Sequence, residues 1–194
     1  ISMLSAERLA LNFMQRMSGI ATATHNLVKL IEGTRAKILD TRKTTPLLRE
    51  LEKMAVRAGG GFNHRMGLYD MIMIKDNHVD FAGGISQAIE AVHQYMSQLK
   101  NGNDLKIEIE VRNFRELDEV LQKGGIDRIM LDNFTVEDLA RAVSIIGGKY
   151  ETEASGGITA ATIRSYAETG VDFISVGALT HHINSLDMSL KAVI

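Results

Sequence analysis

Two adjacent cations follow a short apolar run near residue 40 and are the most informative chemical feature of this chain. The run Ala36–Leu39 is followed by the heptapeptide Asp40-Thr41-Arg42-Lys43-Thr44-Thr45-Pro46. A strand that ends in arginine and lysine places two positive charges on a rigid element, at the strand end where α/β enzymes carry their chemistry. The spacing therefore predicts a site for a strongly anionic small molecule.

Two further cations occur where they could join the same site. Arg65 comes shortly after the triple glycine 59–61, and Lys75 closes the apolar run 71–74. Arginine makes two parallel hydrogen bonds to a carboxylate, whereas lysine supplies a compact charge. Each cation alone could instead form an ordinary surface ion pair. A dicarboxylate would match a pocket that contains all four cations, Arg42, Lys43, Arg65 and Lys75.

Two carboxylates, Glu110 and Asp132, end neighbouring predicted strands. Proteins hold Mg²⁺ in this way, through one or two carboxylates together with substrate phosphates. The alternative is an internal ion pair with Lys75 or Arg65. The histidines lack the i, i+4 spacing of helical zinc ligands, and the neighbours at 181–182 would point in different directions, so we expect no zinc site.

Two glycine-containing turns indicate where a phosphate would bind. Ser155-Gly156-Gly157 lies between a predicted strand and a predicted helix, and Val176-Gly177-Ala178 follows the last predicted strand. Glycine lets backbone N–H groups approach phosphate oxygens, and paired turns of this kind form phosphate sites in many βα barrels. Either turn alone would be an ordinary tight connection, but the pair favours a phosphate site.

Alternating strands and helices must position these residues. Apolar residues at helical spacing predict a long first helix over 5–31. Short β-branched or apolar runs predict strands at 36–39, 71–75, 106–111, 128–131, 150–154 and 173–176. Amphipathic segments between them, several ending at glycine, predict helices at 46–58, 85–99, 114–122, 136–146 and 160–169.

Repeated βα units form either an open doubly wound sheet or a barrel, and periodicity alone leaves both open. Glu108 and Glu110 lie two residues apart, so both carboxylates point to one face of their strand while the aliphatic residues point to the other. A strand with helices on both faces would not tolerate this arrangement. A barrel strand would, because its polar face points into the lumen. We therefore predict a barrel.

Composition excludes several classes of protein. The 194 residues are 45% hydrophobic and contain no linker-like segment, so we expect one domain, with a leading helix over 1–33 and βα units over 34–194. A net charge of −2 predicts no nucleic-acid partner and no anionic membrane partner. The absence of cysteine excludes disulfides and thiolate catalysis and fits the cytoplasm. Charged residues interrupt the opening stretch, so we expect neither a signal peptide nor a membrane span.

Seven ordered motifs resemble the quinolinate phosphoribosyltransferase family along essentially the whole chain. The resemblance implies an incomplete TIM-like α/β barrel of six or seven parallel strands. It also implies transfer of phosphoribosyl from phosphoribosyl pyrophosphate (PRPP) to quinolinate with decarboxylation, with Mg²⁺ required. The motifs are Asp40-Thr41-Arg42-Lys43-Thr44, Gly59-Gly60-Gly61-Phe62-Asn63-His64-Arg65, Ile74-Lys75-Asp76-Asn77-His78, Glu108-Ile109-Glu110-Val111, Leu131-Asp132-Asn133, Glu153-Ala154-Ser155-Gly156-Gly157-Ile158 and Gly177-Ala178-Leu179-Thr180-His181.

By similarity to the family, each motif residue has an expected role. The expected catalytic residues are Lys75, Glu110 and Asp132, with both acids near the metal directly or through water. The residues expected to hold quinolinate are cationic or hydroxyl-bearing: Thr41, Arg42, Lys43, His64, Arg65 and Lys75. Those expected around PRPP are acidic, small or imidazole side chains: Glu110, Asp132, Ser155, Gly156, Gly157, Val176, Gly177, Ala178 and His181.

The resemblance also implies a homodimer or dimer-based oligomer, in which an N-terminal sheet domain lends an arginine to the partner's site. Nothing in these 194 residues corresponds to that domain, so we expect it to be missing from this chain. Three alternatives remain at this stage. They are a nicotinate-type phosphoribosyltransferase, a non-catalytic phosphate-binding barrel, and an aldolase-type barrel in which Lys75 forms a Schiff base.

Overall fold

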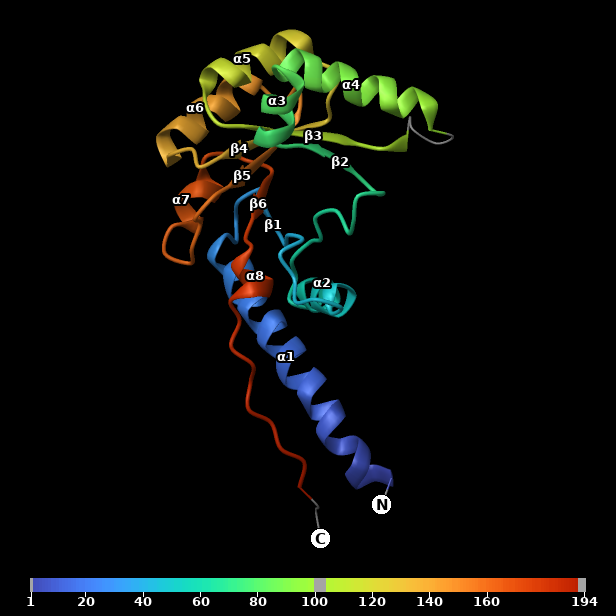
Figure 1. The fold of residues 1–194 in the computed structure, drawn as a ribbon. Helices are drawn as coiled ribbons and strands as arrows, with labels where there is room; N and C mark the ends of the chain where they lie inside the picture. Colours follow the sequence, from blue (N-terminus) through green and yellow to red (C-terminus); the bar gives the residue numbers. More distant parts are fainter. Residues whose placement is uncertain (1, 100–103, 192–194) are drawn as a thin grey trace.

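The structure is a computed structural model that describes residues 2–99 and 104–191, and its centre is one parallel sheet (Figure 1). The strands run in the order β1-β6-β5-β4-β3-β2, and every neighbouring pair is parallel. Among the described residues, β1 and β2 are the two edges and do not pair, so the barrel is open, as predicted. The strands are β1 (Lys37–Leu39), β2 (Ile72–Ile74), β3 (Ile107–Val111), β4 (Arg128–Asp132), β5 (Glu151–Ser155) and β6 (Phe173–Ser175).

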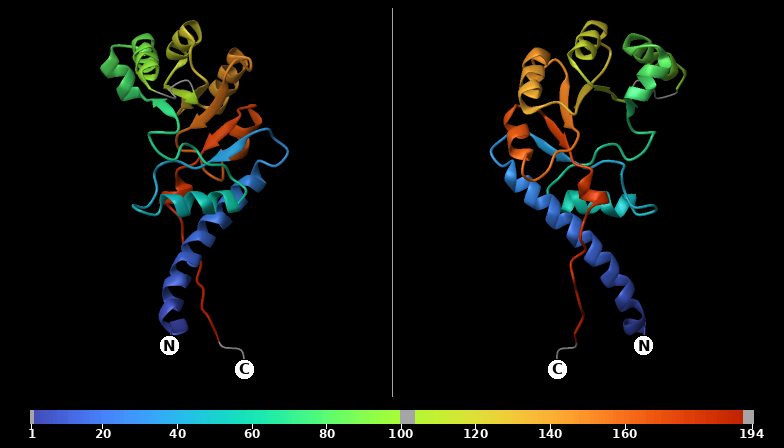
Figure 2. Two further views of the ribbon diagram at one scale, coloured as in Figure 1. Left: turned by 90° about the vertical axis from the view of Figure 1, so that its right-hand side faces the viewer. Right: turned by 60° about the vertical axis from the view of Figure 1, so that its left-hand side comes forward.

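Helices connect the strands, and α4 to α7 follow one another along the outer side of the sheet (Figure 2). Two of them begin at side-chain caps: Asn113 Oδ1 accepts the Glu116 N–H (3.0 Å), and Thr135 Oγ1 accepts the Asp138 N–H (3.1 Å). The helices are α1 (Ser2–Leu30), α2 (Arg49–Ala58), α3 (Asp76–Ala82), α4 (Ile85–Gln98), α5 (Phe114–Lys123), α6 (Val136–Ile146), α7 (Ile163–Glu168) and α8 (Ala178–His181).

The strands divide the interior into an apolar layer and a polar lumen. On β3, Ile107 and Ile109 join the hydrophobic core beneath the outer helices, whereas Glu108 and Glu110 point into the lumen and are also buried. Because side chains alternate along a strand, β4 and β5 repeat this division. The prediction that both carboxylates share one lumen-facing side is confirmed.

Several boundaries differ from the predictions. The helix predicted over 46–58 begins at Arg49, because Pro46 and Leu47 form a turn with Leu47 at a positive φ of 66°. The helix predicted from residue 160 begins at Ile163, after a turn in which the Thr159 carbonyl accepts the Thr162 N–H. The sequence reasoning also missed α3 and α8, since it treated the polar residues after β2 and β6 only as strand ends.

The first helix and the C-terminal segment lie side by side and extend away from the sheet together (Figures 1 and 2). The Leu186 N–H donates to the Gln15 carbonyl, and the Gln15 side chain donates to the Met188 carbonyl, both at 3.1 Å. Leu9 and Met14 on α1 are 63% and 54% exposed. Among residues 2–99 and 104–191, no helix combines the length and apolarity needed to cross a membrane.

Candidate active site

A cavity of about 680 Å³ opens at the carboxyl ends of the strands and brings together all fifteen residues that the sequence analysis placed in the site. In a βα barrel this is the face that carries the chemistry. Their individual roles stay predictions, but their convergence is observed. The fifteen are Thr41, Arg42, Lys43, His64, Arg65, Lys75, Glu110, Asp132, Ser155, Gly156, Gly157, Val176, Gly177, Ala178 and His181.

Three of the four predicted cations have no acidic partner among the described residues. Within residues 2–99 and 104–191, no ion pair involves Arg42, Lys43 or Arg65, and the Nε of Arg42 is buried without a hydrogen-bond acceptor. Burial and the nearby charge of Arg42 lower the pKa of Arg65. Two arginines that repel each other in a cavity form a site that an anion would stabilise. Lys75 instead pairs with Glu110 (Nζ to Oε2, 3.1 Å). The sequence analysis considered such an internal ion pair as the alternative to a metal site at Glu110 and Asp132.

The two predicted metal-binding acids lie on adjacent strands and both line the cavity. Glu110 is 8% exposed and contacts Lys75. Asp132 accepts hydrogen bonds from the Ser155 hydroxyl and from the Asn133 amide (2.6 Å). Carboxylate oxygens on neighbouring strand ends are a suitable donor set for Mg²⁺, which keeps several waters and binds phosphate oxygens as well. The residues present therefore fit the ion.

The two glycine turns leave bare backbone at the cavity wall. Gly156 has φ +97°, and a Cβ there would lie 2.2 Å from the Asn133 Oδ1. A Cβ at Gly177 would come within 3.1 Å of the His181 Nε2 and 3.4 Å of the Lys43 side chain. The first turn therefore needs glycine, and at the second turn the His181 imidazole and the Lys43 side chain lie close to the Gly177 backbone. This arrangement suits an anionic phosphate.

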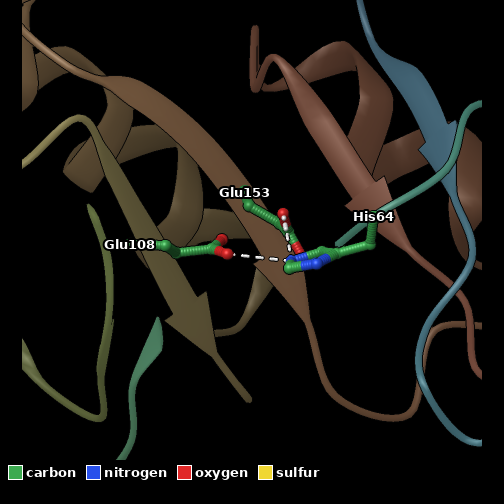
Figure 3. A group of neighbouring side chains, drawn as sticks. All are labelled: His64, Glu108 and Glu153. Atoms are coloured by element: carbon green, nitrogen blue, oxygen red, sulfur yellow. Dashed lines mark ion pairs between the residues drawn. The ribbon is translucent and has the colours of Figure 1, made fainter. Parts of the chain in front are cut away.

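A buried polar cluster in the lumen was only partly anticipated (Figure 3). His64 Nε2 lies 2.8 Å from a Glu108 oxygen and 3.5 Å from a Glu153 oxygen, and Arg128 pairs with Glu153 at 3.1 Å. The sequence reasoning proposed neither Glu153 nor Arg128 for the site. The alternation that identified Glu108 and Glu110, applied to β4 and β5, would have placed both in the lumen.

The charges in this cluster shift one another's titration. Burial lowers the pKa of His64, but the two carboxylates outweigh burial and raise it to about 9. Burial and the charge of Glu153 raise the pKa of Glu108 to about 7. For Glu153 burial acts in the same upward direction, but His64 and Arg128 lower its pKa overall.

The ligand atoms of His64, Glu108 and Glu153 lie within 4.8 Å of one another, which is close enough to hold a metal ion. Two cations, Arg128 and a protonated His64, face the two carboxylates, and Arg128 also pairs with Glu151 (3.1 Å). These charges offset those of the carboxylates without a metal.

Comparison with known proteins gives a consistent result. A family model described as quinolinate phosphoribosyl transferase, C-terminal domain, matches residues 20–191. The chain is 49% identical over 204 residues to quinolinate phosphoribosyltransferase (decarboxylating) 1b of Nicotiana tabacum, covering 98% of this chain and 57% of the relative. It is 45% identical over 193 residues to the probable nicotinate-nucleotide pyrophosphorylase (carboxylating) of Bacillus subtilis, covering 100% of this chain and 65% of the relative.

Solved structures agree with the sequence relatives. The crystal structure of NadC from Streptococcus pyogenes superposes with a TM-score of 0.91 at 42% identity, covering 98% of this chain and 65% of that chain. The nicotinate-nucleotide pyrophosphorylase from Francisella tularensis gives a TM-score of 0.90 at 49% identity, covering 97% and 65%. The chain thus spans about three fifths of the length of its relatives. It belongs to the quinolinate phosphoribosyltransferase family, in the region described by the family's C-terminal domain.

Proposed function

We propose that this chain forms the substrate-binding barrel of an enzyme that transfers the phosphoribosyl group of PRPP to quinolinate. Quinolinate is a pyridine with two adjacent carboxylates. The observation that carries the proposal is the cavity itself, in which Arg42 and Arg65 lack acidic partners among the described residues while Glu110 and Asp132 lie on adjacent strands. The names of the relatives, which specify this transferase, support the same substrate.

In the proposed reaction the pyridine nitrogen attacks C1 of the ribose and the bond from C1 to the pyrophosphate oxygen breaks. The carboxylate at ring position 2 then leaves as CO₂, and a proton from solvent takes its place on the ring. The products are nicotinate mononucleotide, pyrophosphate and CO₂. Positive charge develops at C1 during the transfer, so the site needs nearby carboxylates and fixed reactants more than a protein nucleophile.

The residues divide these tasks by charge. Arg42, Lys43, His64, Arg65 and Lys75 would hold the two carboxylates, with Thr41 at the edge; Thr41 Oγ1 accepts the Lys43 backbone N–H (3.1 Å). Glu110 and Asp132 would face the ribose. The phosphate end would be lined by Ser155, Gly156, Gly157, Val176, Gly177, Ala178 and His181.

Mg²⁺ is the proposed metal cofactor. Glu110 and Asp132 would hold it, directly or through water, from the ends of β3 and β4. When bound, the ion neutralises negative charge on the leaving pyrophosphate.

Lys75 is proposed to contact the carboxylate that leaves. It extends from the end of β2 into the cavity, where its ammonium group pairs with Glu110. An ammonium group held by a carboxylate is a poor nucleophile, which favours this role over a Schiff base. Once the ring nitrogen carries the ribose, its positive charge stabilises the carbanion that decarboxylation leaves behind.

We also propose a homodimer in the cytoplasm, with no nucleic-acid or membrane partner. Exposed apolar side chains on α1, including Leu9 and Met14, supply a surface that a second subunit could cover. The net charge of −2 supports the absence of nucleic-acid binding. Relatives include proteins named as chloroplastic and as mitochondrial, so fractionation of the native protein would test the location.

The test is product formation by the 194-residue chain from quinolinate and PRPP with Mg²⁺, with nicotinate as the competing substrate and calorimetry in parallel. Turnover of quinolinate with release of CO₂ would support the proposal. Binding without turnover would support the pocket assignment and place a required residue outside this chain. Turnover of nicotinate alone would favour the nicotinate-type alternative. Neither binding nor turnover would favour a non-catalytic phosphate-binding barrel.

A further inference from the structure

The segment 61–65 carries two of the proposed quinolinate ligands and lies beside the open edge of the sheet. Phe62 pairs with Leu39 in an isolated parallel bridge, and its N–H donates to the Ile38 carbonyl (2.8 Å). The Asp40 N–H in turn donates to the Phe62 carbonyl (3.2 Å). No further bridge joins the two segments among the described residues, so main-chain pairing ends just before His64 and Arg65 point toward the cavity.

Side chains take over where the main-chain pairing ends. The carboxylate of Asp40 is fully buried and accepts hydrogen bonds from the Lys53 ammonium, the Asn63 amide and the His64 backbone N–H (2.9 Å). Lys53 also donates to the His64 carbonyl (2.9 Å), and the Asn63 amide also donates to the Lys53 carbonyl (2.9 Å). We call Asp40, Lys53 and Asn63 the clamp.

The clamp joins three parts of the chain, which also meet at the Leu39–Phe62 bridge and through Arg49, whose side chain donates to Thr44 Oγ1 and to the Met66 carbonyl (both 3.2 Å). Asp40 follows β1 and directly precedes Thr41 and Arg42, Lys53 lies on α2, and Asn63 directly precedes His64. Both the N–H and the carbonyl of His64 are therefore fixed by clamp side chains. The clamp bonds thus fix the backbone at His64, next to Arg65, and at Asp40, two residues before Arg42.

A buried ion pair is a poor way to gain stability alone. Burial raises the pKa of Asp40 and lowers the pKa of Lys53, which shows that both charges lose hydration. Apolar replacements of similar volume are often as stable as a buried pair, whereas hydrogen-bonded charges fix one geometry. The clamp is therefore better explained as a group that fixes the positions of the segments it joins than as a source of folding stability.

We propose that Asp40, Lys53 and Asn63 are positioning residues that hold Arg42 and Arg65 close enough together to bind two adjacent carboxylates of one ligand. The identity of that ligand rests on the proposed function. Repulsion between the two arginines opposes this arrangement, and neither arginine forms an ion pair among residues 2–99 and 104–191, although the charges of Glu108 and Asp70 attract Arg65 from farther away. The clamp thereby sets the preference for a dicarboxylate over a monocarboxylate.

The test compares wild type with Asn63→Ala and with the double variant Asp40→Asn/Lys53→Met, which leaves no unpaired buried charge. Calorimetry would use phthalate, an unreactive ring with two adjacent carboxylates, and benzoate, which has one. We expect phthalate to bind each variant about tenfold more weakly or worse, because small misplacements of binding groups have effects of this order. Benzoate binding should change less than about twofold, since one arginine suffices for one carboxylate.

Thr152→Val is the matched control. This substitution removes a hydrogen bond from the buried Thr152 hydroxyl to Asp172 (2.8 Å) at the amino ends of the strands, away from the cavity. It therefore shows how much phthalate affinity is lost when the protein is destabilised but the cavity is unchanged. The proposal would be overturned if both clamp variants bound phthalate as tightly as the wild type. It would also be overturned if Thr152→Val, with a melting temperature lowered as much as in the clamp variants, lost as much phthalate affinity as they do. A wild-type protein that does not bind phthalate would overturn it as well. Quinolinate turnover, measured separately, decides the proposed function whichever way the phthalate series comes out.

Discussion

Replacing Glu108 by glutamine should lower the pKa of His64 while preserving the shape of the lumen. In the wild type, His64 Nε2 lies 2.8 Å from Glu108 and 3.5 Å from Glu153, and the pKa of His64 rises from 6.5 to about 9 despite burial. Glutamine removes the closer charge. The remaining carboxylate also pairs with Arg128, so it offsets burial only in part.

The rise of the pKa of His64 from 6.5 to about 9 corresponds to about 3.5 kcal/mol of stability, at about 1.4 kcal/mol for each pH unit. Because the folded pKa lies above the unfolded one, this contribution is complete below pH 6.5 and is lost as the pH rises through about 9. The free energy of unfolding should therefore fall by about 3.5 kcal/mol between those limits in the wild type. In Glu108→Gln the pKa of His64 should be lower, so most of this fall in the free energy of unfolding should be absent between pH 6.5 and about 9.

The measurements are an NMR titration of the His64 ring and urea unfolding at several pH values. Glu151→Gln is the control, because Glu151 pairs with Arg128 and Lys106 but not with His64. One contact opposes protonation: the Arg65 N–H donates to His64 Nδ1 (2.7 Å), which suits the neutral ring. If His64 titrates near 6.5 in the wild type, or equally in both proteins, that contact dominates and the reasoning from the carboxylates is refuted.

Three further predictions address the cavity and the fold. Lys75→Met should greatly lower quinolinate turnover while circular dichroism shows an unchanged fold, and an unchanged rate would remove Lys75 from the mechanism. Gly156→Ala should weaken PRPP binding by tenfold or more, on the order expected for small misplacements, because its Cβ would collide with Asn133; equal affinity by calorimetry would argue against a tight phosphate turn. Asn113→Ala removes the N-cap of α5 and should lower the free energy of unfolding by about 1 kcal/mol, with turnover unaffected.

The sequence predicted each bound of the six strands to within one residue, because most of the strands are short β-branched or apolar runs bounded by polar residues or glycine. It predicted the barrel because Glu108 and Glu110 cannot both lie under helices. It failed at Pro46, since a proline favours a helix start but Leu47 takes a left-handed conformation and delays α2 to Arg49.

The lumen cluster shows why part of the site was missed. Nothing in the local sequence relates His64 to Glu153. The two side chains come close only because segment 61–65 lies beside β1, so that the His64 side chain reaches across the open sheet to β5. The sequence analysis likewise treated Asp40 only as the first residue of a cationic motif and did not predict its buried hydrogen bonds. Its three donors come from β1's neighbouring segment and from α2, and only folding brings them together.

The sequence by itself determined the residue types at the strand ends, and these were enough to identify a parallel barrel and the family and to predict an anionic ligand. Those conclusions follow from local patterns, because alternation, glycine turns and charge depend on residues close in the chain. The tertiary structure decided which charges meet: Lys75 with Glu110, His64 with Glu108 and Glu153, and Asp40 with Lys53. Such pairings depend on strand order and on the route of the chain across the open edge, and these are set by packing of the whole domain.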